Sequence, residues 1–124
     1  MKTRFFCLLL LTLATGSIKA QLANTKWKGV LKLDDPLHVS FNFGKDTLVV
    51  IALDDNSIVE TMTYRLKDSA LTLKKVSGQS DCETASIGKY KYQLKEKSIV
   101  LTVVEDACND RAPYLDNLQL TKNQ

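Results

Sequence analysis

The sequence is poor in the residues that enzymes and metal sites need most. Its 124 residues include one histidine, two prolines and five glycines. With His38 alone, the chain has no Ser/His/Asp set and no histidine-based zinc spacing, and it has no glycine-rich phosphate loop. It also has no proline-rich linker, low-complexity run or long repeat that would separate domains. We therefore predict a single domain that is not an enzyme, with no metal and no cofactor.

Long apolar runs are also missing, apart from one at the start of the chain. Residues 1–20 begin with two cations, continue through a mostly apolar stretch and end in the small residue Ala20. This pattern is typical of a secretory signal peptide, and the stretch is too short to span a membrane comfortably. We predict a signal peptide over residues 1–20, cut after Ala20 or nearer Gly16, and one mature domain over residues 21–124. The mature protein is then secreted or periplasmic, with no membrane span of its own.

An excess of one charge sign is absent from this mature domain. The chain has 17 Lys+Arg and 14 Asp+Glu, but Lys2, Arg4 and Lys19 fall in the predicted signal peptide. The remainder is formally neutral, and it has no clustered Lys/Arg and aromatic stripe beyond the short KYKY of residues 89–92. Because nucleic-acid binding depends on such basic and stacking groups, we expect no nucleic-acid partner. We also expect a monomer.

Cysteine is scarce as well. Cys7 lies in the predicted signal peptide, which leaves Cys82 and Cys108 in the mature domain. An exported chain meets oxidising conditions, so we predict that these two residues form a disulfide worth about 3 kcal/mol of stability. The alternative is a reactive Cys108 thiol activated by Arg111. Such thiols usually need a nearby histidine or a helix N-terminus, so we favour the disulfide.

What the mature domain does have is a succession of short runs that are either apolar, as at residues 47–53, or alternate between apolar and polar residues. Turn residues such as those at 34–36 and 44–46 close the runs, and no amphipathic helix is predicted. Alternation with a period of two is typical of strands with one buried face, and hairpin-length turns make successive strands antiparallel neighbours. The predicted strands cover residues 26–33, 37–43, 47–53, 57–66, 70–76, 89–95, 98–104 and 115–121.

Eight sequential antiparallel strands can close on themselves, and closure removes exposed sheet edges. We therefore predict an all-β fold, a small eight-stranded antiparallel up-and-down β-barrel. A barrel of this size is either filled by side chains or just wide enough for one small ligand. A two-sheet β-sandwich is the alternative fold.

Three segments resemble a known family. Trp27 with Gly29 in the first strand, GKYKYQLKEKSIVLTVV over residues 88–104 and DACNDR over residues 106–111 are similar to the small bacterial lipocalin-like secreted proteins of the calycin group. The resemblance covers nearly all of the mature chain. It implies that Trp27 packs at the closed end of the barrel beneath Arg111, and indole is the best cation–π face among the side chains.

The chain also departs from the lipocalin pattern. Thr25 stands where lipocalins usually have a glycine, two residues before the tryptophan. The chain is short for a member with a deep ligand cup, and no helix is predicted after the seventh strand. These departures weaken the inference that the barrel is hollow and leave the barrel itself untouched.

The candidate ligand-binding residues share the apolar face of their strands. Aromatic and flexible side chains with a few hydroxyl groups are the usual lining of a small-molecule pocket, although the same residues could simply fill the barrel. Glu60 belongs to this face, and a buried carboxylate is costly unless a partner compensates it. It therefore lies at a barrel mouth or meets a tyrosine hydroxyl or a cation in a polar pocket. The candidates are Phe41, Phe43, Glu60, Met62, Tyr64, Tyr90 and Tyr92.

Two functions are consistent with this pattern. The first is the non-covalent binding or transport of a small hydrophobic molecule inside the barrel, as the lipocalin resemblance implies. The second is an interaction module with a filled core, which binds a protein or a cell-envelope component through its loops or sheet surface. An interior cavity of a few hundred Å³ would favour the first function, and its absence would favour the second.

Overall fold

A computed structural model describes residues 22–122 of the chain. The predicted signal peptide lies outside the described residues. The described part is mostly β-strand, and a short helix lies between the last two strands. In chain order the elements are β1 (Thr25–Leu31), β2 (Leu37–Phe43), β3 (Thr47–Ala52), β4 (Ile58–Lys67), β5 (Ala70–Gly78), β6 (Ile87–Lys95), β7 (Ser98–Asp106), α2 (Ala112–Leu115) and β8 (Gln119–Lys122).

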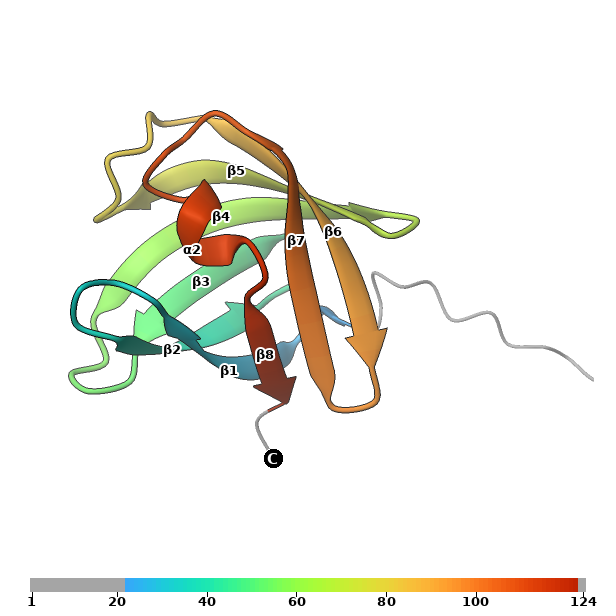
Figure 1. Cartoon of the computed structure of the whole chain (residues 1–124), viewed down its shortest axis with the longest axis horizontal. Coiled ribbons are helices and arrows are strands. Elements are labelled where there is room, and N and C mark those ends of the chain that lie inside the picture. The colour runs from blue at the N-terminus through green and yellow to red at the C-terminus, as the bar shows by residue number, and fades with distance from the viewer. Residues whose placement is uncertain (1–21, 123–124) are drawn as a thin grey trace, which may run out of the picture.

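The eight strands form one closed antiparallel barrel in sequence order (Figure 1). Each strand pairs with the next, and β1 pairs with β8 to complete the ring. The predicted up-and-down barrel is therefore confirmed, and the alternative β-sandwich is wrong. The strand pairing that closes the ring is shortest at β8, which has only two paired positions with β1 and three with β7.

The period-two pattern of the sequence sets which side chains face inward. In β2, for example, Val39, Phe41 and Phe43 are buried in the barrel, whereas His38 is exposed. One continuous hydrophobic cluster fills the interior, from Leu22 and Trp27 in the first part of the chain to Leu120 in β8. Burial of alternate side chains thus stabilises both the strands and the closed ring.

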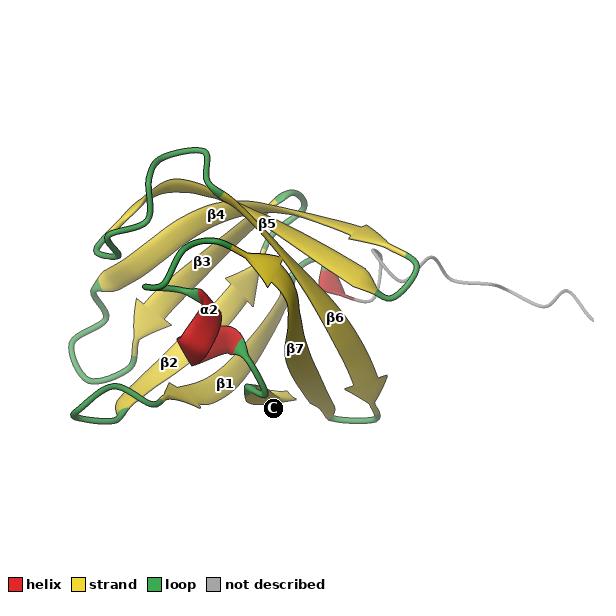
Figure 2. Ribbon diagram, turned by 45° about the horizontal axis from the view of Figure 1, so that its top comes forward, coloured by secondary structure: helices red, strands yellow, loops and turns green. Residues whose placement is uncertain are grey.

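The barrel has two different ends because its strands run up and down. The β2–β3, β4–β5 and β6–β7 hairpins lie at one end together with the start of β1 and the end of β8; we call this the hairpin end. The other four connections lie at the opposite end, which we call the mouth end (Figure 1). The connection from β7 to β8, residues 107–118, contains α2 and lies across the mouth (Figure 2). We call it the lid.

The lid is the part of the fold that the sequence prediction missed. A last strand was predicted from residue 115, but β8 begins at Gln119, and residues 112–115 form the single helical turn α2. One turn is too short to show a helical period, and its second residue is Pro113, which fits the first turn of a helix. Backbone groups of β7 that β8 is too short to pair bond to the lid instead: Leu101 N–H donates to Leu118 C=O at 2.9 Å.

Candidate functional site

The structure brings all seven candidate interior residues together inside the barrel. All are buried: even Glu60, the most accessible of them, is only 8 % exposed. Three of the aromatic rings contact one another: the Phe43 ring lies 6.5 Å from that of Phe41 and, edge to face, 5.1 Å from that of Tyr64, measured between centroids. The Tyr64 hydroxyl donates to the Gly44 carbonyl at 2.6 Å, so it is directed at the hairpin end. Burial and the nearby Asp46 carboxylate raise the pKa of Tyr64, which keeps it a neutral donor.

The space left among these side chains is small. A cavity of about 70 Å³ lies beneath the lid, between inward residues of the strands and the lid residues Arg111, Tyr114 and Leu115. Pockets that hold drug-sized ligands usually measure about 300–1,000 Å³. A cavity of this size has room for a few water molecules or a very small molecule. The interior is therefore close to filled.

Glu60 lies at the mouth and also meets a cation, so both alternatives left open for it describe part of its environment. Its Oε1 is 3.6 Å from Nζ of Lys75, and both side chains are at least nine-tenths buried. The same Lys75 ammonium donates to the Ser80 carbonyl at 2.6 Å and to the Ser80 hydroxyl. Glu60 Oε1 has no hydrogen-bond donor among the described residues and lines the cavity beneath the lid. This ion pair links β4, β5 and the β5–β6 loop.

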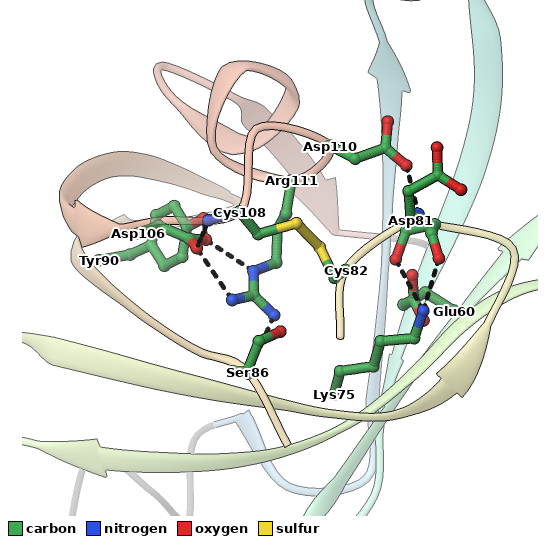
Figure 3. The surroundings of a disulfide bond; sticks show 11 residues. Glu60, Lys75, Asp81, Cys82, Ser86, Tyr90, Asp106, Cys108, Asp110 and Arg111 are labelled. Atoms are coloured by element: carbon green, nitrogen blue, oxygen red, sulfur yellow. Dashed lines mark hydrogen bonds and ion pairs between the residues drawn. A yellow bond between two sulfur atoms is a disulfide. The ribbon is translucent and has the colours of Figure 1, made fainter. Parts of the chain in front are cut away.

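A second buried network holds Arg111. Asp106, at the end of β7, accepts from Arg111 Nε at 2.6 Å, from its second guanidinium nitrogen at 2.9 Å and from the Tyr90 hydroxyl (Figure 3). Asp106 Oδ1 also accepts from the Cys108 backbone N–H at 3.0 Å. Gly88 makes room for this carboxylate, since a Cβ there would lie 2.3 Å from Asp106 Oδ2. The network fastens the root of the lid to β6 and β7.

The surroundings of Asp106, Tyr90 and Arg111 shift the pKa of each of these groups further from neutral pH. Burial alone would raise the pKa of Asp106, but the hydrogen bonds from Arg111 and Tyr90 outweigh it and lower that pKa. The Tyr90 pKa is raised, first by burial and then by its bond to Asp106. Burial alone would lower the pKa of Arg111, but the hydrogen bonds to Asp106 and its negative charge outweigh burial and raise that pKa. Asp106 is therefore an ionised carboxylate, Tyr90 a neutral phenol and Arg111 a cation near neutral pH. Because none of the three gains or loses a proton in this range, the network has a structural role and offers no acid or base for catalysis.

The predicted disulfide is confirmed. Cys82 in the β5–β6 loop and Cys108 in the lid are bonded, with Cα atoms 5.5 Å apart. Asp81 N–H donates to Asp110 Oδ2 at 2.7 Å beside it (Figure 3). Because Cys108 is oxidised, the alternative of a reactive thiol activated by Arg111 has no support. The disulfide instead ties the lid to the neighbouring loop.

The predicted stack of Arg111 on Trp27 is wrong. The cation over the indole ring is Lys122 of β8, with its Nζ 5.9 Å from the ring centroid. Trp27 is near the start of β1 and its Nε1 donates to Thr25 Oγ1 at 2.8 Å, whereas Arg111 is in the lid at the mouth end. The two residues therefore lie at different ends of the barrel. The counter-charge of Arg111 is Asp106.

Two important residues were not among the sequence candidates. Lys75 shares the strand parity of Leu71 and Leu73, so alternation alone could have placed it inside. Asp106 could not be found in this way. Tyr90 pairs with Val103 and Lys89 with Glu105, so a bulge at Val104 reverses the alternation and turns Asp106 inward.

Comparisons with protein-family models, with curated proteins and with solved structures found no match to this chain. Within residues 22–122, no three His, Cys, Asp or Glu side chains are grouped so as to hold a metal ion. No helix in this part of the chain has the length and apolar character needed to cross a membrane.

Proposed function

We propose that this protein is an exported, non-catalytic β-barrel that binds a protein or cell-envelope component through its outer surface. The small interior carries this proposal, because a cavity of about 70 Å³ is far below the space that a lipid-sized ligand needs. The side chains that could have lined a ligand cup pack against one another. The Cys82–Cys108 disulfide fits a protein that resides outside the reducing cytoplasm.

Transport of a small hydrophobic molecule is the second candidate, and the position of the cavity favours it. The cavity lies directly beneath the lid and reaches Phe41, Val50 and Met62 of the interior. Displacement of the lid would join this space to the mouth. Such a movement has to break the buried Asp106–Arg111 pair or strain the disulfide, so the lid is held shut by interactions that a ligand would need to overcome.

Titration with apolar probes separates the two functions. Palmitate, retinol and N-phenyl-1-naphthylamine are added to the oxidised protein while Trp27 fluorescence and the melting temperature are recorded. The filled barrel predicts no saturable change with any probe, because a cavity of about 70 Å³ is too small to hold any of them. A Cys82→Ser/Cys108→Ser variant, in which the lid has lost its covalent attachment to the β5–β6 loop, serves as the matched comparison. Saturable binding by either protein at micromolar probe concentration would replace the proposed function with the carrier function.

A further inference from the structure

The outward face of β4, β5 and β6 concentrates positive charge. Strand register places nine outward positions in three rows across these strands, and five of the nine are cations. All five cations are exposed, and within residues 22–122 none of them is in an ion pair. We call this surface the basic face. Its rows are Thr63–Lys74–Ile87, Arg65–Thr72–Lys89 and Lys67–Ala70–Lys91.

This concentration is a property of the fold, since the cations are scattered in the sequence. Neighbouring positions lie about 5 Å apart across strands and about 7 Å apart along them. The described chain has equal numbers of acidic and basic residues, so the basic face reflects an uneven distribution of charge. The mouth-end loops carry much of the opposite charge, at Asp34, Asp35, Asp54, Asp55, Asp81, Glu83 and Asp110.

The basic face is also hollowed. An open depression of about 930 Å³ lies over β4 and β5, lined by Arg65, Lys67 and Lys74 with the hydroxyl residues Thr63 and Thr72. Three acidic residues lie at or beside the basic face: Asp46 lines the depression, Asp68 follows Lys67 in the β4–β5 turn, and Glu105 of β7 is paired in register with Lys89. Like charges at this spacing repel one another, and a bound polyanion would relieve that repulsion.

Resting on the proposed surface-binding function, we propose that the basic face binds a linear acidic polysaccharide. Ammonium and guanidinium groups would pair with its carboxylate or sulfate groups, and the threonine hydroxyls would bond to its sugar oxygens. No aromatic residue occupies any of the nine positions, so the base stacking that single-stranded nucleic acids require is missing. Ile87 is the only large apolar side chain among them, too little for insertion into a lipid surface.

Binding is measured by calorimetry with dextran sulfate and polygalacturonate, with uncharged dextran as the control polymer. The wild-type protein should bind both acidic polymers and lose affinity steeply as sodium chloride rises from about 50 to about 300 mM. The variant Arg65→Gln/Lys74→Gln/Lys89→Gln should bind about tenfold or more weakly. The matched variant Lys26→Gln/Lys28→Gln/Lys32→Gln removes the same charge from exposed positions of β1 and the loop that follows it, and should stay within about twofold of wild type.

Three outcomes would overturn the inference. The first is no binding of either acidic polymer at low salt. The second is equal weakening by both triple variants, which would reduce the effect to net charge. The third is tighter binding to phosphatidylglycerol vesicles or to an oligothymidine strand than to the polysaccharides. Each leaves the surface-binding function standing, because that function fails only if the apolar probes bind inside the barrel.

Discussion

At the scale of single residues, the centre of the molecule's polar architecture is Asp106. Its carboxylate is fully buried and receives hydrogen bonds from Arg111, Tyr90 and the Cys108 backbone. Removing one partner of a buried ion pair is costly because it leaves the other charge uncompensated. The residue therefore stabilises the junction of β6, β7 and the lid far more than an exposed acid would.

We expect Asp106→Asn to lower the free energy of unfolding by about 3 kcal/mol at neutral pH, since Arg111 loses its buried counter-charge. The difference from wild type should depend on pH. The folded-state pKa of Asp106 is lowered, so its stabilising effect is complete above the unfolded value of about 3.9 and is lost as pH falls through the folded pKa. Urea unfolding between about pH 7 and pH 2 should show the two curves converging in acid.

The exposed Asp34 provides the control for this measurement. Asp34→Asn should change stability by no more than about 0.5 kcal/mol at neutral pH. A gap between wild type and Asp106→Asn that stayed constant down to the lowest pH would show that the lost interaction is packing, with no contribution from the carboxylate charge.

Residue roles were predictable only where one local rule decided them. The cysteine pair followed from having two cysteines in an exported chain, and burial of the aromatic candidates followed from alternation. The predicted partner of Arg111 was wrong because it was taken from the lipocalin resemblance, which implies Trp27. The true partner, Asp106, faces inward only because of a bulge at Val104, which strict alternation does not predict. One extra residue in a strand turns a carboxylate from the solvent to the core, and no residue type in this segment indicates the bulge.

At the scale of elements, the lid is fastened at three kinds of point. The disulfide joins it to the β5–β6 loop, the Asp106–Arg111 pair joins it to β7, and Leu115 and Leu118 pack into the core. Its Asp116 side chain also accepts the Val103 backbone N–H at 2.9 Å, in place of a strand partner. Sequence periodicity could predict the seven longer strands but not this segment, because one helical turn and a four-residue strand are held by tertiary contacts.

Removing the disulfide should destabilise the protein without opening the barrel. We expect Cys82→Ser/Cys108→Ser to lose about 3 kcal/mol of unfolding free energy, from the greater freedom of the unfolded chain. The ion pair and the buried leucines should still hold the lid in place. Hydrogen exchange of the native variant would test this: the Val103 and Leu101 amides, which bond to the lid, should remain protected. Rapid exchange at these two amides alone would mean that the disulfide is what keeps the lid closed.

At the scale of the whole molecule, the closed barrel was predictable because the same pattern, a short run closed by turn residues, recurs along the mature domain. Most runs alternate, most connections are short, and closure removes the edges that an open sheet would expose. The distribution of charge over the barrel was not predictable in the same way. Arg65, Lys74 and Lys89 lie in three different runs, and only the register between strands makes them neighbours. A search along the sequence for basic clusters therefore missed the basic face.

The continuity of the core leads to a last prediction, about how the molecule unfolds. One hydrophobic cluster runs from Trp27 near the hairpin end to Leu115 in the lid, so neither end has a core of its own. We expect a single cooperative transition in urea, with Trp27 fluorescence and far-ultraviolet circular dichroism coinciding and a slope of roughly 1–3 kcal/mol/M. The oxidised and disulfide-free proteins should both behave in this way, with different midpoints. If the dichroism changed at lower urea than the fluorescence, the mouth end would be unfolding independently of the barrel around Trp27, and the lid would then be able to open for a ligand while the rest of the fold stayed intact.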